Sequence, residues 1–249
     1  MTGLLEGKAA LVTGGAAGLG LAIIQGFAAA GARGFAFDLV PPTQPLPAGW
    51  DHRVGDVREE NSLAAALAAA KDKLGRLDIL VANAGVVPPW RDSEAIDLDE
   101  WDDVFAVNVR GVVATIKQGV ALMKPAGGSI IVMASVSARE GHPRQAAYVA
   151  SKHAALGIAR ATALDVGRFG IRVNALCPGP VATPALLQRL RERAESGISS
   201  EKEALRRYNQ TALGRIASMK DVAGAAVFLA SGLSSGITGQ AIVVDAGAR

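Results

Sequence analysis

The chain has 249 residues, half of them apolar and a fifth charged, and its 26 basic and 23 acidic residues give a formal net charge of +3. The length fits one large α/β domain as well as two small ones, and the apolar fraction excludes a disordered chain. The small net charge and the 4% of aromatic residues argue against a nucleic-acid interface. The single cysteine, Cys177, excludes an intramolecular disulfide. No apolar run approaches the roughly 18 residues that span a bilayer. We therefore expect a soluble cytoplasmic protein that binds neither nucleic acid nor membranes.

Short apolar runs alternate along the chain with longer helical patterns. The runs predict strands at Ala9–Val12, Phe35–Phe37, Arg53–Val54, Ile79–Ala82, Ile130–Met133, Ile171–Leu176 and Ala241–Val244. Segments rich in Ala and Leu predict helices at Leu19–Ala30, Leu63–Leu74, Trp101–Lys124, Tyr148–Arg168 and Asp221–Ala230. Most runs are apolar throughout, as in parallel strands covered on both faces. The pattern predicts a Rossmann-type doubly wound sheet of about seven parallel strands, with helices on both faces.

Two segments break this alternation. Pro41–Pro47 holds four prolines and predicts a surface loop. The polar, helical segment 184–211 has no strand directly after it, so we expect an insertion over the face of the sheet that serves as a substrate lid. Nothing resembles a linker, and we expect a single domain over residues 1–249.

A glycine-rich turn follows the first predicted strand. It reads Thr13-Gly14-Gly15-Ala16-Ala17-Gly18-Leu19-Gly20 and leads into a predicted helix. Such a turn lets the backbone approach a pyrophosphate, which the N–H groups of the helix N-terminus attract. Glycine also serves tight turns for backbone reasons alone, so the turn by itself is weak support. Its T-G-x-x-x-G-x-G spacing resembles that of the short-chain dehydrogenase/reductase family.

Asp38 ends the second predicted strand, 18 residues after Gly20. An acidic residue near this distance accepts hydrogen bonds from the adenosine ribose diol and repels a 2′-phosphate. Leu39 follows, and the glycine turn contains no Arg or Lys that would receive that phosphate. We therefore predict NAD rather than NADP as the cofactor.

Further short elements resemble the cofactor site of the same family. The resemblance implies that Asp56 and Val57 contact adenine, and that residues after Pro178-Gly179 hold the nicotinamide carboxamide. The cofactor-binding residues that it implies are Gly14, Ala17, Gly18, Leu19, Gly20, Asp38, Leu39, Asp56, Val57, Asn83, Ala84, Gly85, Tyr148, Lys152, Pro178, Gly179, Val181 and Thr183. Two positions depart from the family pattern: Ala82 replaces a second Asn and Ala246 replaces a Gly.

Tyr148 and Lys152 stand four residues apart at the start of a predicted helix, which places both side chains on one face. Such a pair alone usually lies on a solvated surface. Ser135 follows the fifth strand, and Asn108 lies early in another helix. Their order, and the 13-residue gap from Ser135 to Tyr148, resemble the catalytic tetrad of the family. The resemblance implies that Asn108, Ser135, Tyr148 and Lys152 are catalytic. The histidines show no metal-ligand spacing, and we expect no metal.

The chemistry explains these residue types. A tyrosine with a pKa of about 10 is a poor base at neutral pH. A cation at about 4 Å, with an effective dielectric constant of about 20, attracts the phenolate by roughly 4 kcal/mol, or up to roughly three pKa units before desolvation. We therefore expect Lys152 to lower the pKa of Tyr148, which acts as acid/base. By resemblance, Lys152 also binds the nicotinamide ribose, Ser135 orients the substrate oxygen, and Asn108 holds a water that joins Lys152 to solvent.

These residues predict an NAD-dependent oxidoreductase that transfers hydride between a secondary alcohol (a polyol, sugar or cyclic alcohol) and the nicotinamide. The main alternative is a 3-oxoacyl thioester reductase of the same family, which Asp38 disfavours because reductive biosynthesis usually draws on NADPH. A regulator that senses NAD without turnover would not need Tyr148, Lys152 and Ser135. The resemblance also implies a homotetramer, with one interface on the helices over 108–124 and 148–168.

Residues 86–90, 136–142 and the lid are expected to bound the substrate. Trp90 walls a cyclic or sugar-like substrate or packs at the rim, while Ser137 and Gln145 offer hydrogen bonds. For His142 a solvated loop position is the preferred interpretation. The lid arginines would attract an anionic substrate, but interspersed glutamates favour a solvated helix face; these arginines are Arg189, Arg191, Arg193, Arg206 and Arg207.

Overall fold

A single parallel sheet forms the centre of the molecule. The computed structural model describes residues 3–124, 126–195 and 200–248. The strand order is β3-β2-β1-β4-β5-β6-β7, and every neighbouring pair is parallel. The strands are β1 (Ala9–Thr13), β2 (Arg33–Asp38), β3 (Trp50–Val54), β4 (Ile79–Ala82), β5 (Gly128–Met133), β6 (Ile171–Pro178) and β7 (Ala241–Val244). The predicted fold class and strand number are confirmed.

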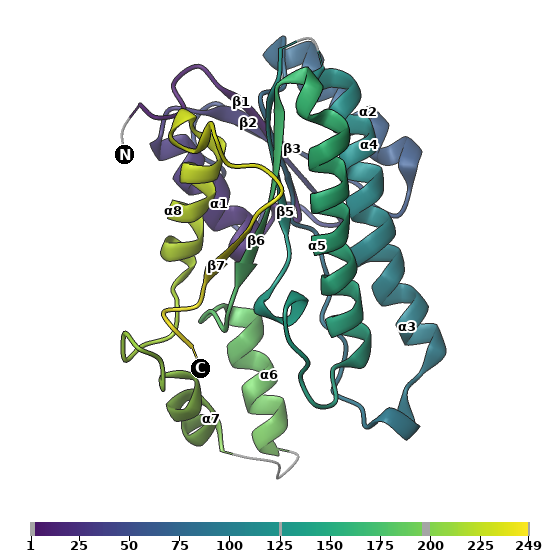
Figure 1. Ribbon diagram of the computed structural model, residues 1–249, viewed down its shortest axis with the longest axis vertical. Coiled ribbons are helices and arrows are strands. Elements are labelled where there is room, and N and C mark those ends of the chain that lie inside the picture. Colours follow the sequence, from purple (N-terminus) through teal and green to yellow (C-terminus); the bar gives the residue numbers. More distant parts are fainter. Residues whose placement is uncertain (1–2, 125, 196–199, 249) are drawn as a thin grey trace.

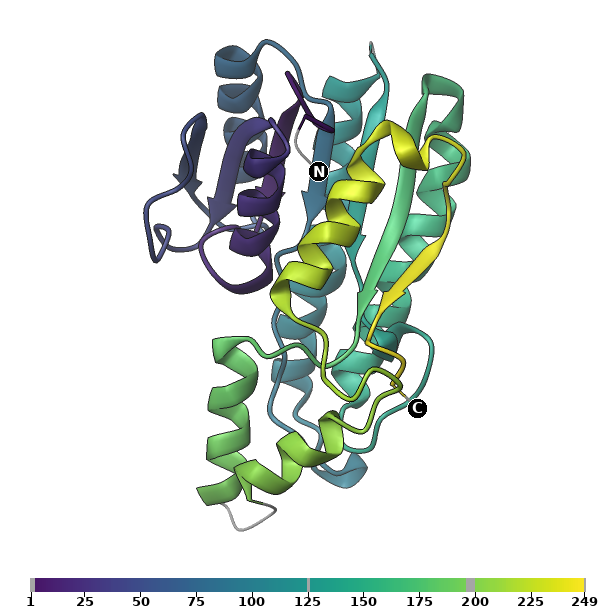
Figure 2. The same cartoon turned by 90° about the vertical axis from the view of Figure 1, so that its left-hand side faces the viewer.

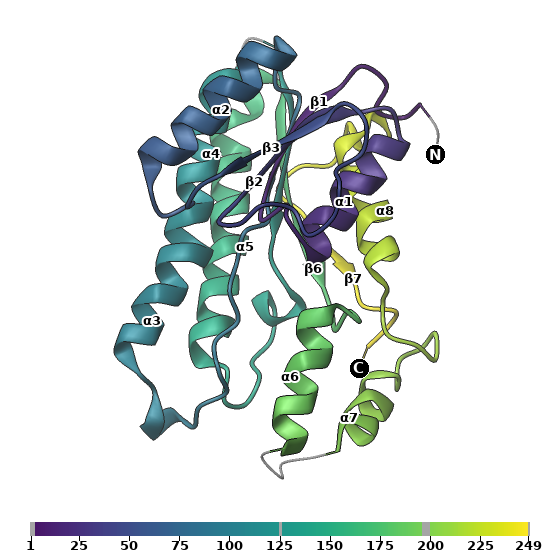
Figure 3. The ribbon, with the colours of Figure 1, turned by 180° about the vertical axis from the view of Figure 1, so that it is seen from behind.

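Helices cover both faces of this sheet. On one face lie α1 (Gly18–Ala29) and α8 (Met219–Ala230). On the other lie α2 (Glu60–Leu74), α4 (Val112–Met123) and α5 (Ala146–Val166). The two layers are seen edge-on in Figure 1 and from behind in Figure 3. This arrangement gives the inner strands two buried faces, which explains why runs such as β4 are apolar throughout, whereas the edge strand β3 is polar and largely exposed.

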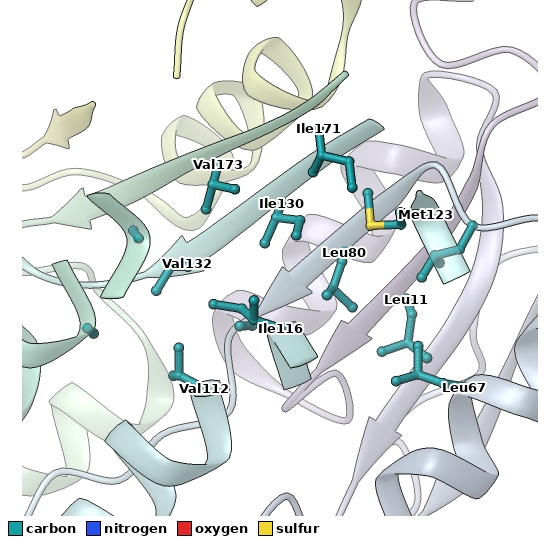
Figure 4. Packing of buried hydrophobic residues seen from close by; sticks show 14 of the residues in the cluster. Leu11, Leu67, Leu80, Val112, Ile116, Met123, Ile130, Val132, Ile171 and Val173 are labelled. Atoms are coloured by element: carbon teal, nitrogen blue, oxygen red, sulfur yellow. The ribbon is translucent and has the colours of Figure 1, made fainter. Parts of the chain in front are cut away.

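Alternate residues of each strand enter different cores. Leu11, Leu80 and Ile130 lie in the cluster under α2, α4 and α5, and Figure 4 shows them on neighbouring strands. Val12 and Val81, one position further along, lie in the cluster under α1 and α8. Each is fully buried. Burying such a side chain stabilises the fold by about 1.5–3 kcal/mol, so these two layers fix the strand register and the positions of the strand ends.

One predicted helix is interrupted in the structure. The sequence predicts a continuous helix over Trp101–Lys124, whereas the chain forms α3 (Leu98–Phe105), a π-helical segment at Ala106–Gly111, and then α4. A π-turn adds one residue to the turn, and such turns occur mostly at functional sites. Apolar periodicity does not reveal it, because both helices keep the same buried face.

The segment 184–211 contains α6 (Pro184–Glu195) and α7 (Glu201–Tyr208). We expected it over a face of the sheet, but both helices lie beyond the carboxyl ends of the strands (Figures 1 and 2). The chain leaves β1 toward β2 on one side and reaches β4 on the other. Doubly wound sheets bind ligands at this point, where the strand order reverses. The two helices therefore face the crevice that the fold reserves for a ligand.

Candidate active site

A group of hydrogen bonds joins the ends of β1 and β4. The Thr13 hydroxyl donates to the Val81 carbonyl at 3.3 Å and accepts from the backbone N–H groups of Asn83 and Ala84 at 3.0 and 3.2 Å. The Asn83 side chain donates to the carbonyls of Thr13 and Gly14 at 2.9 and 3.0 Å. Asn83, predicted to contact the cofactor, thus also holds the glycine turn in place.

The glycine turn has no space for larger residues at two positions. Gly14 has a φ of +64°, and a Cβ there would lie 2.8 Å from the Ala84 Cα. A Cβ on Gly20 would lie 2.0 Å from the Gly14 carbonyl oxygen. Helix α1 begins immediately after this turn with neither a side-chain cap nor an acidic residue in its first turn. Its first N–H groups and positive dipole end therefore suit a pyrophosphate.

Asp38 lies beside this turn at the end of β2. Its carboxylate accepts a hydrogen bond from the Ala16 N–H at 2.9 Å. The Thr43 hydroxyl donates to the Ala16 carbonyl at 3.1 Å, so the proline-rich loop is attached to the same turn. The second carboxylate oxygen of Asp38 has no hydrogen bond or ion pair within the described residues and borders the cavity. The group thus fits a ribose diol at this end of the site.

One cavity of about 1020 Å³ joins the glycine turn to the predicted catalytic residues. Every cofactor-binding residue predicted from the sequence borders it, from Gly14 at one end to Thr183 at the other. Ser135, Tyr148 and Lys152 also border it, whereas Asn108 does not. The structure therefore brings together residues that are spread over most of the chain, and it leaves one predicted catalytic residue behind the cavity wall.

The carboxylate of Asp56 is bound by its own neighbour. Arg58 donates to Asp56 through its backbone N–H and its Nε, both at 2.8 Å. The Arg58 guanidinium holds the pKa of Asp56 below its usual value, so the carboxylate is ionised and accepts hydrogen bonds. Arg58 was not among the predicted site residues, although its spacing of two from Asp56 is visible in the sequence.

Lys152 is buried, with 5% of its surface exposed. Its Nζ donates to the Met133 carbonyl at 2.9 Å, at the end of β5, and lies 5.7 Å from the centre of the Tyr148 ring. Burial lowers the pKa of Lys152 to about 8. A lysine in this state exchanges a proton near neutral pH far more readily than an exposed one.

The pKa of the Tyr148 phenol differs from the value expected from the sequence. Burial raises the pKa of Tyr148, and the opposing influences come from the Ser135 hydroxyl and the charge of Arg189. Lys152 is not among the groups that shift it. The predicted lowering of the Tyr148 pKa is therefore wrong for this structure, because burial of the phenol outweighs the influences that lower its pKa.

Asn108 sits in the π-helical segment and is fully buried. Its Oδ1 accepts from the Val86 N–H at 2.8 Å, and its Nδ2 donates to the Val86 carbonyl at 2.9 Å and to the Ser151 hydroxyl at 3.1 Å. A Cβ on Gly85 would lie 3.2 Å from this Oδ1 and 3.5 Å from the Lys152 Nζ. Asn108 thus holds the chain after β4 beside Lys152. Ser151, which sequence reasoning missed, fixes the orientation of the amide.

The loops predicted to bound the substrate are attached to each other. The Arg91 N–H donates to the Arg144 carbonyl at 3.0 Å, and the Arg91 guanidinium forms two 3.0 Å hydrogen bonds with Glu100. The Arg144 guanidinium lies 5.6 Å from the centre of the Trp90 ring. Trp90 borders the cavity. It therefore forms a fixed wall, supported by two arginines that have no counterpart in the motifs.

Ser137 and Gln145, predicted to offer hydrogen bonds to the substrate, border the cavity, and so does His142, for which a solvated loop position was the preferred interpretation. Of the lid arginines, Arg189 and Arg207 border it, while Arg191 and Arg206 are exposed and lie away from it. The side chain of Arg193 lies outside the described residues. Cys177 is buried, and burial raises the pKa of its thiol, as expected for a packing residue.

A metal-binding cluster or a membrane-spanning helix among the described residues would change the class of protein. Among the residues with described placement, no cluster of three His, Cys, Asp or Glu side chains could bind a metal ion. In the same part of the chain, no helix combines the length and apolar character needed to cross a membrane. Fold and site together define a dinucleotide-binding protein with a Ser-Tyr-Lys group at the far end of the cavity.

Comparisons with known proteins identify the family. A family model described as enoyl-(acyl carrier protein) reductase matches residues 14–249. Short-chain dehydrogenase reductase 4 of Arabidopsis thaliana is 36% identical over 259 residues, which cover 99% of this chain and 85% of that protein. The chain belongs to the short-chain dehydrogenase/reductase family, whose members are oxidoreductases that act on alcohols or ketones with a nicotinamide cofactor.

Two relatives indicate the range of the family. The 3-oxoacyl-[acyl-carrier-protein] reductase of Thermotoga maritima is 36% identical over 254 residues, with 98% of each chain covered. The crystal structure of carveol dehydrogenase from Mycobacterium avium in complex with NAD superposes with a TM-score of 0.89 at 31% identity, covering 99% of each chain. The predicted family and the predicted use of a nicotinamide cofactor are confirmed.

The short distance between Gly20 and the Gly14 carbonyl allows a test of whether the glycine turn binds the cofactor. We expect Gly20→Ala to weaken NADH affinity at least roughly tenfold, because the added Cβ displaces the Gly14 carbonyl and with it the turn. NADH fluorescence titration measures the affinity. Gly236→Ala, where a Cβ meets nothing within 4 Å, is the control and should bind normally. Unchanged NADH affinity in Gly20→Ala would contradict the assignment of this turn.

The buried ammonium of Lys152 predicts a dependence of stability on pH. Its pKa in the folded protein is about 8, against about 10.4 in the unfolded chain. Because the folded value is the lower one, the cost of the buried charge applies in full below pH 8 and falls away as the pH rises from there to about 10.4. Lys152→Met should therefore raise the free energy of unfolding at pH 7 by about 1–2 kcal/mol, after the lost hydrogen bond is counted.

Urea denaturation of the cofactor-free protein at pH 7, 8, 9 and 10 measures this effect. The advantage of Lys152→Met over the wild type should shrink steadily across the series. Lys220→Met, which removes an exposed lysine, is the control and should show no such trend. A stability difference that stays constant with pH, or a destabilised Lys152→Met protein at pH 7, would contradict the assigned burial.

Proposed function

We propose that the protein is an NAD-dependent dehydrogenase that interconverts a secondary alcohol and the matching ketone, with Tyr148 as the acid/base. One observation carries this proposal. Ser135, Tyr148 and Lys152 border the same cavity as the glycine turn and Asp38, and the strand order separates Ser135, after β5, from Asp38, at the end of β2. A cofactor bound along the cavity has its nicotinamide end beside a titratable phenol.

The chain's own residues handle the proton. The bound nicotinamide supplies the acceptor or donor of hydride. Tyr148 takes the hydroxyl proton of the alcohol, or returns it to the ketone, and the Ser135 hydroxyl, which lowers the pKa of the phenol, orients the substrate oxygen. Lys152, with a pKa of about 8, lies next to the phenol and is poised to exchange protons near neutral pH.

Asn108 supports this group from behind the cavity wall. Its side-chain amide is engaged by Val86 and Ser151. We assign it two tasks: it fixes the chain beside Lys152, and the π-helical segment that carries it provides the place for a water between Lys152 and solvent. The second task follows from the family resemblance and from the position of Gly85 between Asn108 and Lys152.

The preference for NAD rests on Asp38. Its carboxylate borders the adenosine end of the cavity and is held by the Ala16 N–H. A 2′-phosphate there would face a like charge without a partner. The NAD complex of the carveol dehydrogenase, which shares 31% identity with this chain, is consistent with this choice.

The substrate we favour is a cyclic or polyhydroxylated secondary alcohol. The wall made by Trp90 and the polar groups of Ser137 and Gln145 suit a ring that carries further polar groups. A 3-oxoacyl thioester reductase is the second candidate, favoured by the Thermotoga maritima relative.

We propose that α6 and α7, within 184–211, close over the substrate as a lid of the single domain. The alternative of a different class is a protein that senses NAD without turnover. The Ser-Tyr-Lys group disfavours it, because binding of NAD alone does not need these three side chains.

The assembly and the location remain predictions. We propose a homotetramer in which the outer faces of α4 and α5 meet their copies. Val113 on α4 and Leu164 on α5 are exposed large apolar residues, at 46% and 87%, and contact between copies would cover them. The cytoplasmic location is a prediction from composition alone.

The cofactor preference is tested by turnover with each dinucleotide. We expect kcat/KM for NAD to exceed that for NADP by at least roughly a hundredfold, because like charges without partners cost several kcal/mol. Asp38→Ser should narrow this ratio, while Asp72→Ser, at an exposed position on α2, should leave it unchanged. A higher kcat/KM with NADP in the wild type would overturn the preference.

The role of Tyr148 is tested with Tyr148→Phe. On any alcohol that the wild type oxidises, turnover measured at 340 nm should fall by at least roughly a hundredfold, since the acid/base is lost. NADH affinity should stay within about threefold, because the ring remains. Tyr208→Phe, at the second cavity-lining tyrosine, should retain turnover. Turnover like that of the wild type in Tyr148→Phe would refute the mechanism.

A further inference from the structure

Arg189 occupies a position that the sequence does not distinguish from its neighbours. It lies on α6, is half-buried, and borders the cavity that also contains Ser135 and Tyr148. The other arginine of α6 with a described side chain, Arg191, is exposed and lies away from the cavity. The glutamates between the lid arginines predicted that all of these arginines lie on a solvated helix face. In the structure, Arg189 lies at the cavity instead.

The guanidinium of Arg189 has no ion-pair partner among the side chains that the structure describes. Arg207, the other lid arginine at the cavity, is exposed and lies 3.8 Å from Glu203. A guanidinium that is half-buried and without a counter-ion favours an anionic ligand, because such a ligand supplies the missing partner.

The acidic groups around the cavity have partners of their own. Asp38 is bound by the Ala16 N–H and Asp56 by Arg58, both at the adenosine end. Nearer to the lid, Glu140 is exposed and lies 3.8 Å from His142. Asp245 accepts a hydrogen bond from the Gly247 N–H at 2.8 Å. The substrate end of the cavity therefore keeps the positive charge of Arg189 beside the reacting groups.

We propose that Arg189 binds a carboxylate of the substrate, so that the enzyme acts on secondary alcohols or ketones that carry a carboxyl group. This inference rests on the proposed function and narrows its substrate class. A single guanidinium presents a planar fork that matches one carboxylate bidentately, whereas a phosphate dianion usually has more than one cation around it. One arginine at the substrate end thus selects a planar monoanion.

The position of Arg189 relative to Tyr148 places this carboxylate near the reacting oxygen. Arg189 and Tyr148 border the same cavity, and the charge of Arg189 lowers the pKa of the phenol. A carboxylate held there belongs to the same small molecule as the alcohol that Tyr148 deprotonates. A distant anionic group, such as the phosphate of a thioester carrier, does not satisfy this geometry.

Binding is tested separately from turnover. Isothermal titration of the NADH-saturated protein compares cyclohexanecarboxylate with cyclohexanecarboxamide, which has a similar shape and no charge. The wild type should bind the carboxylate at least roughly tenfold more tightly, the effect of one charge-assisted pair. Arg189→Met should lose this difference, and the control Arg191→Met should keep it. Equal binding of the two probes, binding of neither, or an unchanged preference in Arg189→Met would overturn the proposal.

Turnover distinguishes this inference from the proposed function. Hydroxycyclohexanecarboxylates are assayed with NAD beside their carboxamides. We expect Arg189→Met to lower kcat/KM on the acids at least roughly tenfold more than on the amides, because any effect on the Tyr148 phenol is common to both substrates. A wild type that oxidises acids and amides equally contradicts the role of Arg189 and leaves the proposed function standing. Binding of the carboxylate through Arg189 without turnover of any alcohol contradicts the proposed function and leaves this binding site standing.

Discussion

The hydrogen bonds that join the ends of β1 and β4 are the constraint on which the site depends. Thr13 and Asn83 connect the two strands at the point where the strand order reverses, and Asn83 reaches into the glycine turn. On one side of this connection lies the cradle for a pyrophosphate. On the other the chain continues through Gly85 to the surroundings of Asn108 and Lys152. The same few bonds thus set the distance between the glycine turn and Lys152, the two parts of the site to which we assign cofactor binding and proton transfer.

The catalytic end of the cavity holds groups that a stable core would avoid. Lys152 is a buried ammonium with one carbonyl partner, and Asn108 is a buried amide in an interrupted helix. Each is tolerated because surrounding groups satisfy it, including Ser151 for the amide. Burial that disfavours the charged lysine also brings its pKa to about 8, within reach of proton exchange at neutral pH. The burial of Lys152 therefore lowers the stability of the fold while it favours the proton exchange that we propose for this side chain.

Much of the architecture was predictable because local patterns carry it. Apolar runs located the strands, and motif spacing located the residues that border the cavity. What the sequence did not reveal depends on tertiary contacts: the π-helical segment around Asn108 with its Ser151 partner, and the attachment of Arg144 to Trp90. The expected lowering of the Tyr148 pKa failed for the same reason. Spacing places Tyr148 and Lys152 on one helix face, but only the fold decides how deeply the phenol is buried.

The central claim is that one continuous cavity brings a nicotinamide ring to Tyr148. A crystal structure of the protein with bound NADH tests it most directly. The account predicts the adenosine ribose on Asp38, the pyrophosphate at the start of α1, and the nicotinamide between Tyr148 and the Val181–Thr183 segment. A nicotinamide outside this end of the cavity, or an adenosine placed at the Tyr148 end, would contradict it.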